Sequence, residues 1–177
     1  MTTVNLKKRS PCSGYTLVEV LAAFTLFTVA IGPALWIVTN ATNTTVLIQN
    51  NLIAANLAQE GLEVIHAMRD TAWLEGQTLQ DYRLCGPVNC PVGQDYAVRV
   101  EYDSDESLPL NGNPPLKLDK TTGVYSYETG DETIFKRQIT INKVSDNETK
   151  VISRVDWNER GSDKNITLES HLFNWNQ

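Results

Sequence analysis

A long apolar run near the N-terminus is the feature that most constrains this chain. It covers the 24 residues from Tyr15 to Val38, and Glu19 is its one charged residue. Such a length is enough to span the roughly 30 Å hydrocarbon core of a bilayer as an α-helix. A carboxylate inside the segment costs about 2.5–3.5 kcal/mol on insertion scales, which makes Glu19 a functional candidate. The alternative is an ordinary anchor whose glutamate reaches the lipid headgroups.

A short basic leader precedes the run. Residues 1–14 contain Lys7, Lys8 and Arg9 and no acid, so the net charge of −6 becomes −9 for the part after Gly14. Positive charge beside an apolar helix predicts a cytoplasmic leader and a head outside the cytoplasm. The run is too long for a secretory signal peptide and no small-x-small site follows it, so we expect a retained transmembrane helix. The acidic remainder lacks the basic patch that a nucleic-acid surface needs.

The junction of leader and run resembles the type IV prepilin family, which includes the pseudopilins of type II secretion. Basic residues precede Gly14, and Tyr-Thr-Leu-Val-Glu-Val-Leu then continues from Tyr15 into the apolar helix. The resemblance implies that a membrane peptidase cuts after Gly14 and also methylates the new amine of Tyr15. It implies that Glu19 is the assembly residue, placed near the amine of a neighbouring subunit. Cys12 would be lost with the leader.

The chemistry of these positions fits that expectation. Gly14 has no side chain, so a peptidase can approach the backbone closely. The amine that cleavage creates at Tyr15 is a cation at neutral pH. A buried carboxylate is heavily penalised when unpaired and tolerated when paired, so we expect Glu19 to set the register of subunits.

The resemblance also implies partners and a location. The partners are a prepilin peptidase and methyltransferase, other pilins or pseudopilins, an inner-membrane assembly platform, and membrane lipid before assembly. The location is the inner membrane, with the head outside the cytoplasm, and then a pilus or pseudopilus at the cell surface. A second tract, Asn-Leu-Ala-Gln-Glu-Gly from Asn56 to Gly61, followed by Trp73-Leu74, is similar to PilV-type minor pilins and I-type minor pseudopilins.

Gly32 and Pro33 interrupt the apolar run. A proline inside a regular helix removes a hydrogen bond and costs about 3 kcal/mol. One interpretation is a static kink, which membrane helices tolerate. The family resemblance suggests the other, a segment that melts when the subunit leaves the membrane.

Helical spacing continues beyond the apolar run. Residues 39–75 are expected to form an amphipathic continuation, in a single helix from about Tyr15 to Asp70. Apolar or small residues recur at three-, four- and seven-residue spacing and should face a head domain; these are Val46, Ile53, Leu57, Gly61, Val64 and Met68. Glu60, Glu63, Arg69 and Asp70 are expected on a solvated face of this helix, with possible short-range pairs.

Residues 76–177 are expected to form a β-rich head. Apolar and polar residues alternate within 96–102, 135–141, 151–157 and 166–172, which is typical of half-buried antiparallel strands. Residues 159–163 are a predicted hairpin turn, and 103–123 are predicted to be a long loop. The expected fold is α+β, with the long helix packed on an antiparallel sheet.

Two small groups in the head are candidate sites. Cys85 and Cys90 are predicted to form a disulfide, since the head is expected outside the cytoplasm. The alternative is half of a zinc site, although His66 and His171 lie far off in sequence. The second group is a weak calcium candidate of clustered carboxylates, formed by Asp103, Asp105 and Glu106.

No catalytic motif accompanies these features. The sequence has no phosphate-binding loop, zinc-protease helix, nucleophile elbow or dinucleotide fingerprint, so we expect neither an enzyme nor a cofactor. The expected function is that of a minor pilin or pseudopilin, which assembles into or primes a type IV pilus or a type II secretion pseudopilus. The alternative is a single-pass, membrane-anchored binding module that never polymerises.

Overall fold

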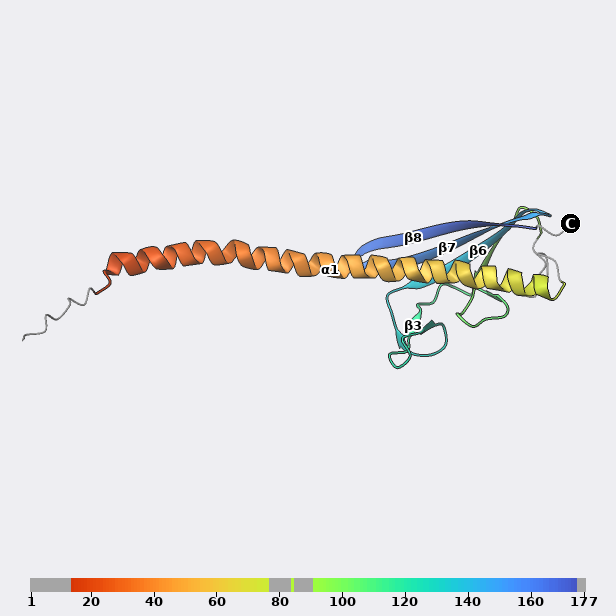
Figure 1. Ribbon diagram of the computed structural model, residues 1–177, viewed down its shortest axis with the longest axis horizontal. Coiled ribbons are helices and arrows are strands. Elements are labelled where there is room, and N and C mark those ends of the chain that lie inside the picture. Colours follow the sequence, from red (N-terminus) through yellow and green to blue (C-terminus); the bar gives the residue numbers. More distant parts are fainter. Residues whose placement is uncertain (1–13, 77–83, 85–90, 175–177) are drawn as a thin grey trace, which may run out of the picture. The chain divides into compact units, whose positions relative to one another are not determined.

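The computed structural model describes residues 14–76, 84 and 91–174 of the 177-residue chain. The chain divides into two compact units, Met1–Leu47 and Ile48–Gln177. One helix, α1 (Leu17–Leu74), contributes to both units, and all the strands belong to the second (Figure 1). The predicted α+β fold is confirmed.

Helix α1 has 58 residues and extends slightly beyond the predicted C-terminal end at Asp70. It ends at Leu74, after which Gly76 takes a φ of 74° and donates its N–H to the carbonyl of Trp73. Glycine adopts this left-handed conformation without a Cβ clash, so it commonly follows the last turn of a helix. At its other end, α1 continues through Gly32 and Pro33 without ending. Melting of this segment in a filament stays a prediction.

The second unit contains two antiparallel sheets. The larger has the strand order β2-β1-β6-β7-β8 and the smaller has the order β4-β3-β5. The larger sheet consists of β1 (Asp95–Arg99), β2 (Leu108–Pro109), β6 (Lys136–Ser145), β7 (Glu148–Glu159) and β8 (Ser162–Phe173). The smaller consists of β3 (Lys117–Leu118), β4 (Tyr125–Ser126) and β5 (Asp131–Glu132).

Most of the predicted strands are confirmed. The alternating runs at 135–141, 151–157 and 166–172 fall within β6, β7 and β8. The run at 96–102 is shorter in the structure, because β1 ends at Arg99 and a turn follows. The prediction of one loop over 103–123 is wrong in part, since β2 and β3 lie within it. Both strands have only two residues, too few for alternation to reveal them.

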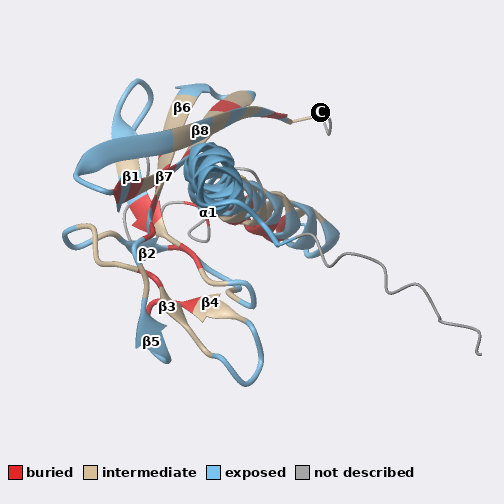
Figure 2. Ribbon diagram, turned by 90° about the vertical axis from the view of Figure 1, so that its left-hand side faces the viewer, coloured by how far each residue is buried: buried red, intermediate tan, exposed pale blue. Residues whose placement is uncertain are grey.

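The core lies between the second half of α1 and the five-stranded sheet (Figure 2). The predicted stripe is largely confirmed, because Leu57, Gly61, Val64 and Met68 are buried. Val46 was wrongly placed in it: the residue is 47% exposed and belongs to the first unit, which has no sheet to cover it.

The hairpin between β7 and β8 confirms the predicted turn. Its two loop residues, Arg160 and Gly161, have φ values of 52° and 81°. Two consecutive positive φ values define the tight turn whose twist matches that of paired strands. The pairing of β7 with β8 continues from Glu159 opposite Ser162 to Glu148 opposite Phe173 without a register shift.

Candidate processing and assembly site

Thr16 caps the start of α1. The N–H of Glu19 lies 3.3 Å from Oγ1 of Thr16 and 3.0 Å from its carbonyl oxygen, and the N–H of Val20 also donates to that carbonyl. A threonine at this position satisfies one of the backbone donors that the first turn of a helix leaves without a partner. The structure therefore starts the helix beside the predicted cleavage point between Gly14 and Tyr15.

The cap places Glu19 at the third position of the helix. Threonine followed three residues later by glutamate has the spacing of a capping box. The exposed N–H groups of a first turn carry partial positive charge, so they favour a carboxylate there. This local role of Glu19 was not predicted, although the Thr16-x-x-Glu19 spacing is visible in the sequence.

Gly14 has no steric reason to be glycine in this structure. A Cβ built on it would meet nothing within 4 Å. The same is true of Gly32. If position 14 must be glycine, the requirement therefore comes from a molecule that acts on the chain. The predicted peptidase is such a molecule.

The first part of α1 exposes an apolar surface. Large side chains along it are uncovered, including Leu17 at 77%, Phe24 at 66% and Trp36 at 70% exposure. Among the described residues, α1 is the one helix long and apolar enough to cross a membrane, and none of its most apolar window is buried. Exposed apolar surface of this extent needs lipid or other apolar helices around it.

A partly buried ion pair joins the second half of α1 to the sheet. Arg137 of β6 is fully buried, and its Nη1 lies 2.8 Å from Oε1 of Glu60. The same guanidinium donates to the carbonyl oxygens of Leu57, at 3.2 Å, and Val100, at 2.7 Å. The prediction of a solvated Glu60 is therefore wrong, because this carboxylate compensates a buried charge.

Two further residues complete this contact. The hydroxyl of Tyr127 donates to the Arg137 carbonyl at 2.9 Å, and burial raises the pKa of that phenol. Gly61 lies directly over the sheet, where a Cβ would come within 2.8 Å of Ile139 Cδ1 and 2.9 Å of Ser153 Oγ. Glycine at this position lets helix and sheet approach closely.

Each of the two histidines contacts polar side chains of the head. Nε2 of His66 lies 2.9 Å from Oγ of Ser170, and burial is the first cause that lowers the pKa of this imidazole. His171 lies on the surface between Glu148, at 2.7 Å, and Glu169, at 3.0 Å. The hydrogen bond with Glu148 is the first cause that raises the pKa of His171.

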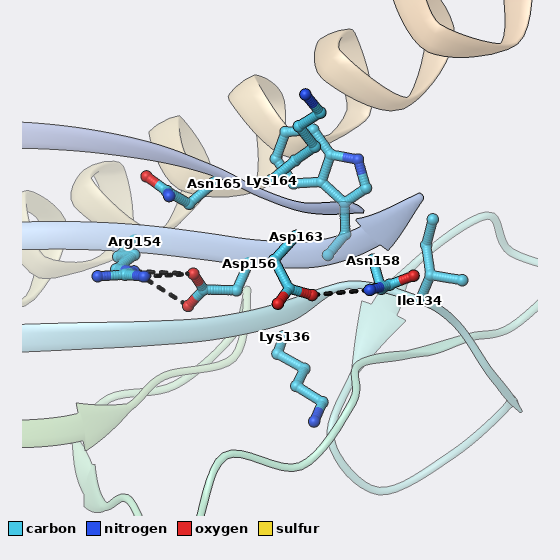
Figure 3. A pocket seen from close by; sticks show the side chains of 9 residues that line it. Ile134, Lys136, Arg154, Asp156, Asn158, Asp163, Lys164 and Asn165 are labelled. Atoms are coloured by element: carbon cyan, nitrogen blue, oxygen red, sulfur yellow. Dashed lines mark hydrogen bonds and ion pairs between the residues drawn. The ribbon is translucent and has the colours of Figure 1, made fainter. Parts of the chain in front are cut away.

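A polar hollow of about 320 Å³ lies near the β7–β8 hairpin. Its lining includes an ion pair of Arg154 with Asp156 and a hydrogen bond from Asn158 to Asp163 (Figure 3). Arg154 and Asp156 neutralise each other, and Asp163 accepts a hydrogen bond from a neutral amide; Lys136 and Lys164 also line the hollow.

The calcium and disulfide candidates of the head both stay predictions. Asp103 and Asp105 line a hollow of about 200 Å³ beside α1, but the described part of the chain contains no group of three His, Cys, Asp or Glu side chains placed to hold a metal ion. The calcium candidate, which includes Glu106, therefore stays a weak prediction. Cys85 and Cys90 lie outside the described residues, and their disulfide stays a prediction as well.

Comparison with known proteins supports the N-terminal interpretation. Residues 9–35 match the family model of the prokaryotic N-terminal methylation motif. No curated protein and no solved structure matches the chain significantly. The motif, the apolar helix and the α+β head are together consistent with a type IV prepilin-like protein. The motif further implies processing by a prepilin peptidase and assembly with other pilins.

Proposed function

We propose that this chain is a minor pilin or pseudopilin, a structural subunit that enters or primes a type IV pilus or a type II secretion pseudopilus. The peptidase cuts between Gly14 and Tyr15, and the amine of Tyr15 is methylated. Before assembly the chain is a single-pass protein of the inner membrane, surrounded by lipid, with its head outside the cytoplasm. Through the assembly platform it then joins the filament.

One observation carries this proposal: the apolar surface of the first half of α1 is uncovered and contains a single carboxylate, Glu19. In lipid this surface is satisfied by acyl chains, and in a filament it is satisfied by the same surface of neighbouring helices. The matched methylation motif covers this segment from residue 9 to residue 35.

Glu19 gives the packing of these helices a register. Cleavage creates a cationic amine at Tyr15, and the carboxylate of a neighbouring subunit can pair with it. A pair buried among apolar helices contributes little net stability, but a register that leaves either charge alone is strongly disfavoured. The pair therefore selects one offset between subunits.

The minor role rests on the tract from Asn56 to Gly61, which resembles minor pilins and minor pseudopilins. Two residues of this tract contact the sheet of the head. Glu60 pairs with Arg137, and Gly61 allows helix α1 to approach β6 closely. On this proposal the protein is scarce in sheared filaments, and its deletion reduces the number of filaments. Finding it as the dominant filament protein contradicts the minor role.

Mass spectrometry of the N-terminus of the mature protein tests the proposal. The expected result is a chain that begins at Tyr15 and carries one added methyl group on its amine. An intact leader, or a cut beyond Val38, contradicts the proposal and favours a membrane-anchored binding module that does not polymerise. Gly14→Ala should leave the fold unchanged, because its Cβ meets nothing, and should slow cleavage.

A further inference from the structure

A single asparagine–glycine pair lies in the loop that follows β2. Asn111 precedes Gly112, and at no other point in the sequence does glycine follow asparagine. Both residues are exposed, and Gly112 takes a φ of 73° at a bend of the chain. Glycine adopts this conformation without a Cβ clash, and asparagine is common beside it in turns. The pair also has a chemistry of its own, because the amide carbon of an asparagine side chain can be attacked by the next backbone nitrogen.

The surroundings of the pair leave that reaction unhindered. A Cβ built on Gly112 would meet nothing within 4 Å, so no neighbouring atom crowds its backbone. Within the described part of the chain, no hydrogen bond engages the side chain of Asn111 or the N–H of Gly112. Neither group therefore has to give up a hydrogen bond before it reacts. Two groups that are already adjacent react far faster than the same groups on separate molecules.

Other asparagines of the head lack this combination. Asn113 precedes Pro114, whose backbone nitrogen has no hydrogen to lose. Asn158 is held by its own side chain, which donates to Asp163 at 2.7 Å and accepts a hydrogen bond from the N–H of Gly161 at 3.0 Å. The exposed and unhindered amide is that of Asn111.

We propose that Asn111 is a site of spontaneous deamidation in the folded head. The backbone nitrogen of Gly112 gives up its proton and attacks Cγ of Asn111, and the side-chain nitrogen takes up a proton and leaves as ammonia. The product is a succinimide ring. Water then opens the ring at one of its two carbonyl carbons, and the backbone nitrogen regains its proton. Opening at Cγ gives aspartate, whereas opening at the α-carbonyl gives isoaspartate, in which the main chain runs through Cγ.

Both products alter a loop that is held at its two ends. Each adds a carboxylate, and isoaspartate also lengthens the main chain by one methylene group. Before the loop, the N–H of Leu110 donates to the carbonyl of Ala97 at 3.1 Å. After it, the N–H of the fully buried Leu116 donates to the carbonyl of Phe135 at 2.8 Å. The extra methylene group has to be taken up between these anchors, so the head acquires a second covalent and conformational form as it ages.

Incubation of the purified full-length chain, in detergent and in heavy-oxygen water, tests the proposal. Ring opening takes one oxygen atom from water, so mass spectrometry separates newly formed product from older product. Digestion with an acid protease limits further reaction, and fragmentation by electron transfer distinguishes aspartate from isoaspartate. We expect both labelled products at Asn111, and at least about tenfold less label at Asn147, an exposed asparagine followed by Glu148. Equal labelling of the two positions, or label at Asn111 as aspartate alone, overturns the proposal.

The same measurement on the denatured chain isolates the contribution of the fold. In guanidinium chloride the pair reacts at the rate that its sequence alone allows. Because the structure leaves Gly112 uncovered and its N–H unengaged by the described residues, we expect the folded chain to react within about threefold of the denatured chain. A folded rate below that range shows that the fold protects the site, and it overturns the proposal.

Asn111→Gln provides the matched variant. It keeps an exposed amide at this position, but its longer side chain closes a larger and less favoured ring. We expect the label at position 111 to fall by at least about tenfold. Unchanged labelling in this variant, with a circular dichroism spectrum like that of the unsubstituted chain, overturns the proposal.

The dependence of the rate on pH identifies the mechanism. The attacking species is the deprotonated nitrogen of Gly112, so deamidation should be at least about tenfold faster in mildly alkaline than in mildly acidic buffer. A rate that is independent of pH, or greatest in acid, indicates direct hydrolysis of the side chain and overturns ring closure. None of these results depends on N-terminal processing, so the proposal can fail while the proposed function holds.

Discussion

The guanidinium of Arg137 is fully buried, and its Nη1 lies 2.8 Å from Oε1 of Glu60. This ion pair joins the long helix to the central strand β6. Its geometry gives the helix a preferred position on the sheet, since sliding the helix by one turn would leave a buried charge without its partner. Gly61, the next residue, provides the space for that close contact.

Glu60→Ala should destabilise the head. Its side chain is 34% exposed, so water screens part of the lost interaction, and we expect a loss of about 2–3 kcal/mol in the free energy of unfolding. Chemical denaturation followed by circular dichroism measures it. The control is Glu63→Ala, which removes an exposed carboxylate bonded to Gln59 and should change stability by less than about 0.5 kcal/mol. Similar losses in both variants would contradict a special role of the Arg137 pair.

Gly61→Ala should also destabilise the head, against the usual trend. Alanine normally gains about 1 kcal/mol over glycine inside a helix. Here its Cβ would come within 2.8 Å of Ile139 Cδ1, and overpacking should reverse the sign to a net loss of about 1–2 kcal/mol. Ile139→Val removes that atom, so the same glycine substitution should cost less in the valine background. A double-mutant cycle by denaturation measures the coupling, and additive effects would contradict the steric explanation.

The two histidines should titrate on opposite sides of the ordinary value of 6.5. His171, held by Glu148, has a raised pKa, so its contribution to stability is complete below 6.5 and is lost as the pH rises through the folded pKa. His66 has a pKa lowered first by burial, so its contribution is present above 6.5 and is lost as the pH falls below it.

NMR titration of the imidazole signals measures both midpoints. Glu148→Gln removes the first cause of the His171 shift and should lower that midpoint, but leave His66 unchanged. Glu132→Gln, on β5 of the smaller sheet, is the matched control and should change neither. A midpoint of His171 below that of His66 in the unsubstituted protein would contradict the assignment.

Local periodicity explains what the sequence could predict. The long helix and strands β6, β7 and β8 follow from spacings that are legible in any window of ten residues. The pairing of Glu60 with Arg137 joins residues 77 positions apart, which no local pattern specifies. A signal was nevertheless present, because Arg137 occupies an inward position of an alternating strand, between Phe135 and Ile139. A charge there requires a partner.

At the N-terminal site, the sequence motif predicts roles that the fold of a single chain does not reveal. A short motif predicts roles for Gly14, Tyr15 and Glu19, and these stay predictions because the expected roles involve other molecules and leave little trace in the fold of one chain. The part that belongs to this chain alone, the cap by Thr16, was missed even though its spacing to Glu19 is visible. A threonine just before the apolar run, with a glutamate three residues later, is a helix-start signal that predicts this cap.

Glu19→Ala should separate processing from assembly. The proposed peptidase site between Gly14 and Tyr15 is unchanged in this variant, so cleavage and methylation should continue at the normal level. On the proposed pairing, loss of the carboxylate leaves the amine of a neighbouring Tyr15 without its partner, and removing one member of a buried pair costs about 3–5 kcal/mol. Incorporation into filaments should therefore fall by at least about tenfold, since each 1.4 kcal/mol is a factor of ten. Mass spectrometry measures processing, and immunoblotting of sheared filaments measures incorporation.

Two variants in the same helix make this test specific. Thr16→Ala removes the cap but keeps the carboxylate, so it should fray the first turn at a cost of about 1 kcal/mol and reduce incorporation less than Glu19→Ala does. Thr25→Ala removes an exposed hydroxyl that donates to the Ala22 carbonyl of its own helix, and it should assemble normally. If Thr16→Ala matches the effect of Glu19→Ala, the glutamate acts through the helix start. If Glu19→Ala assembles normally, the amine does not need this carboxylate.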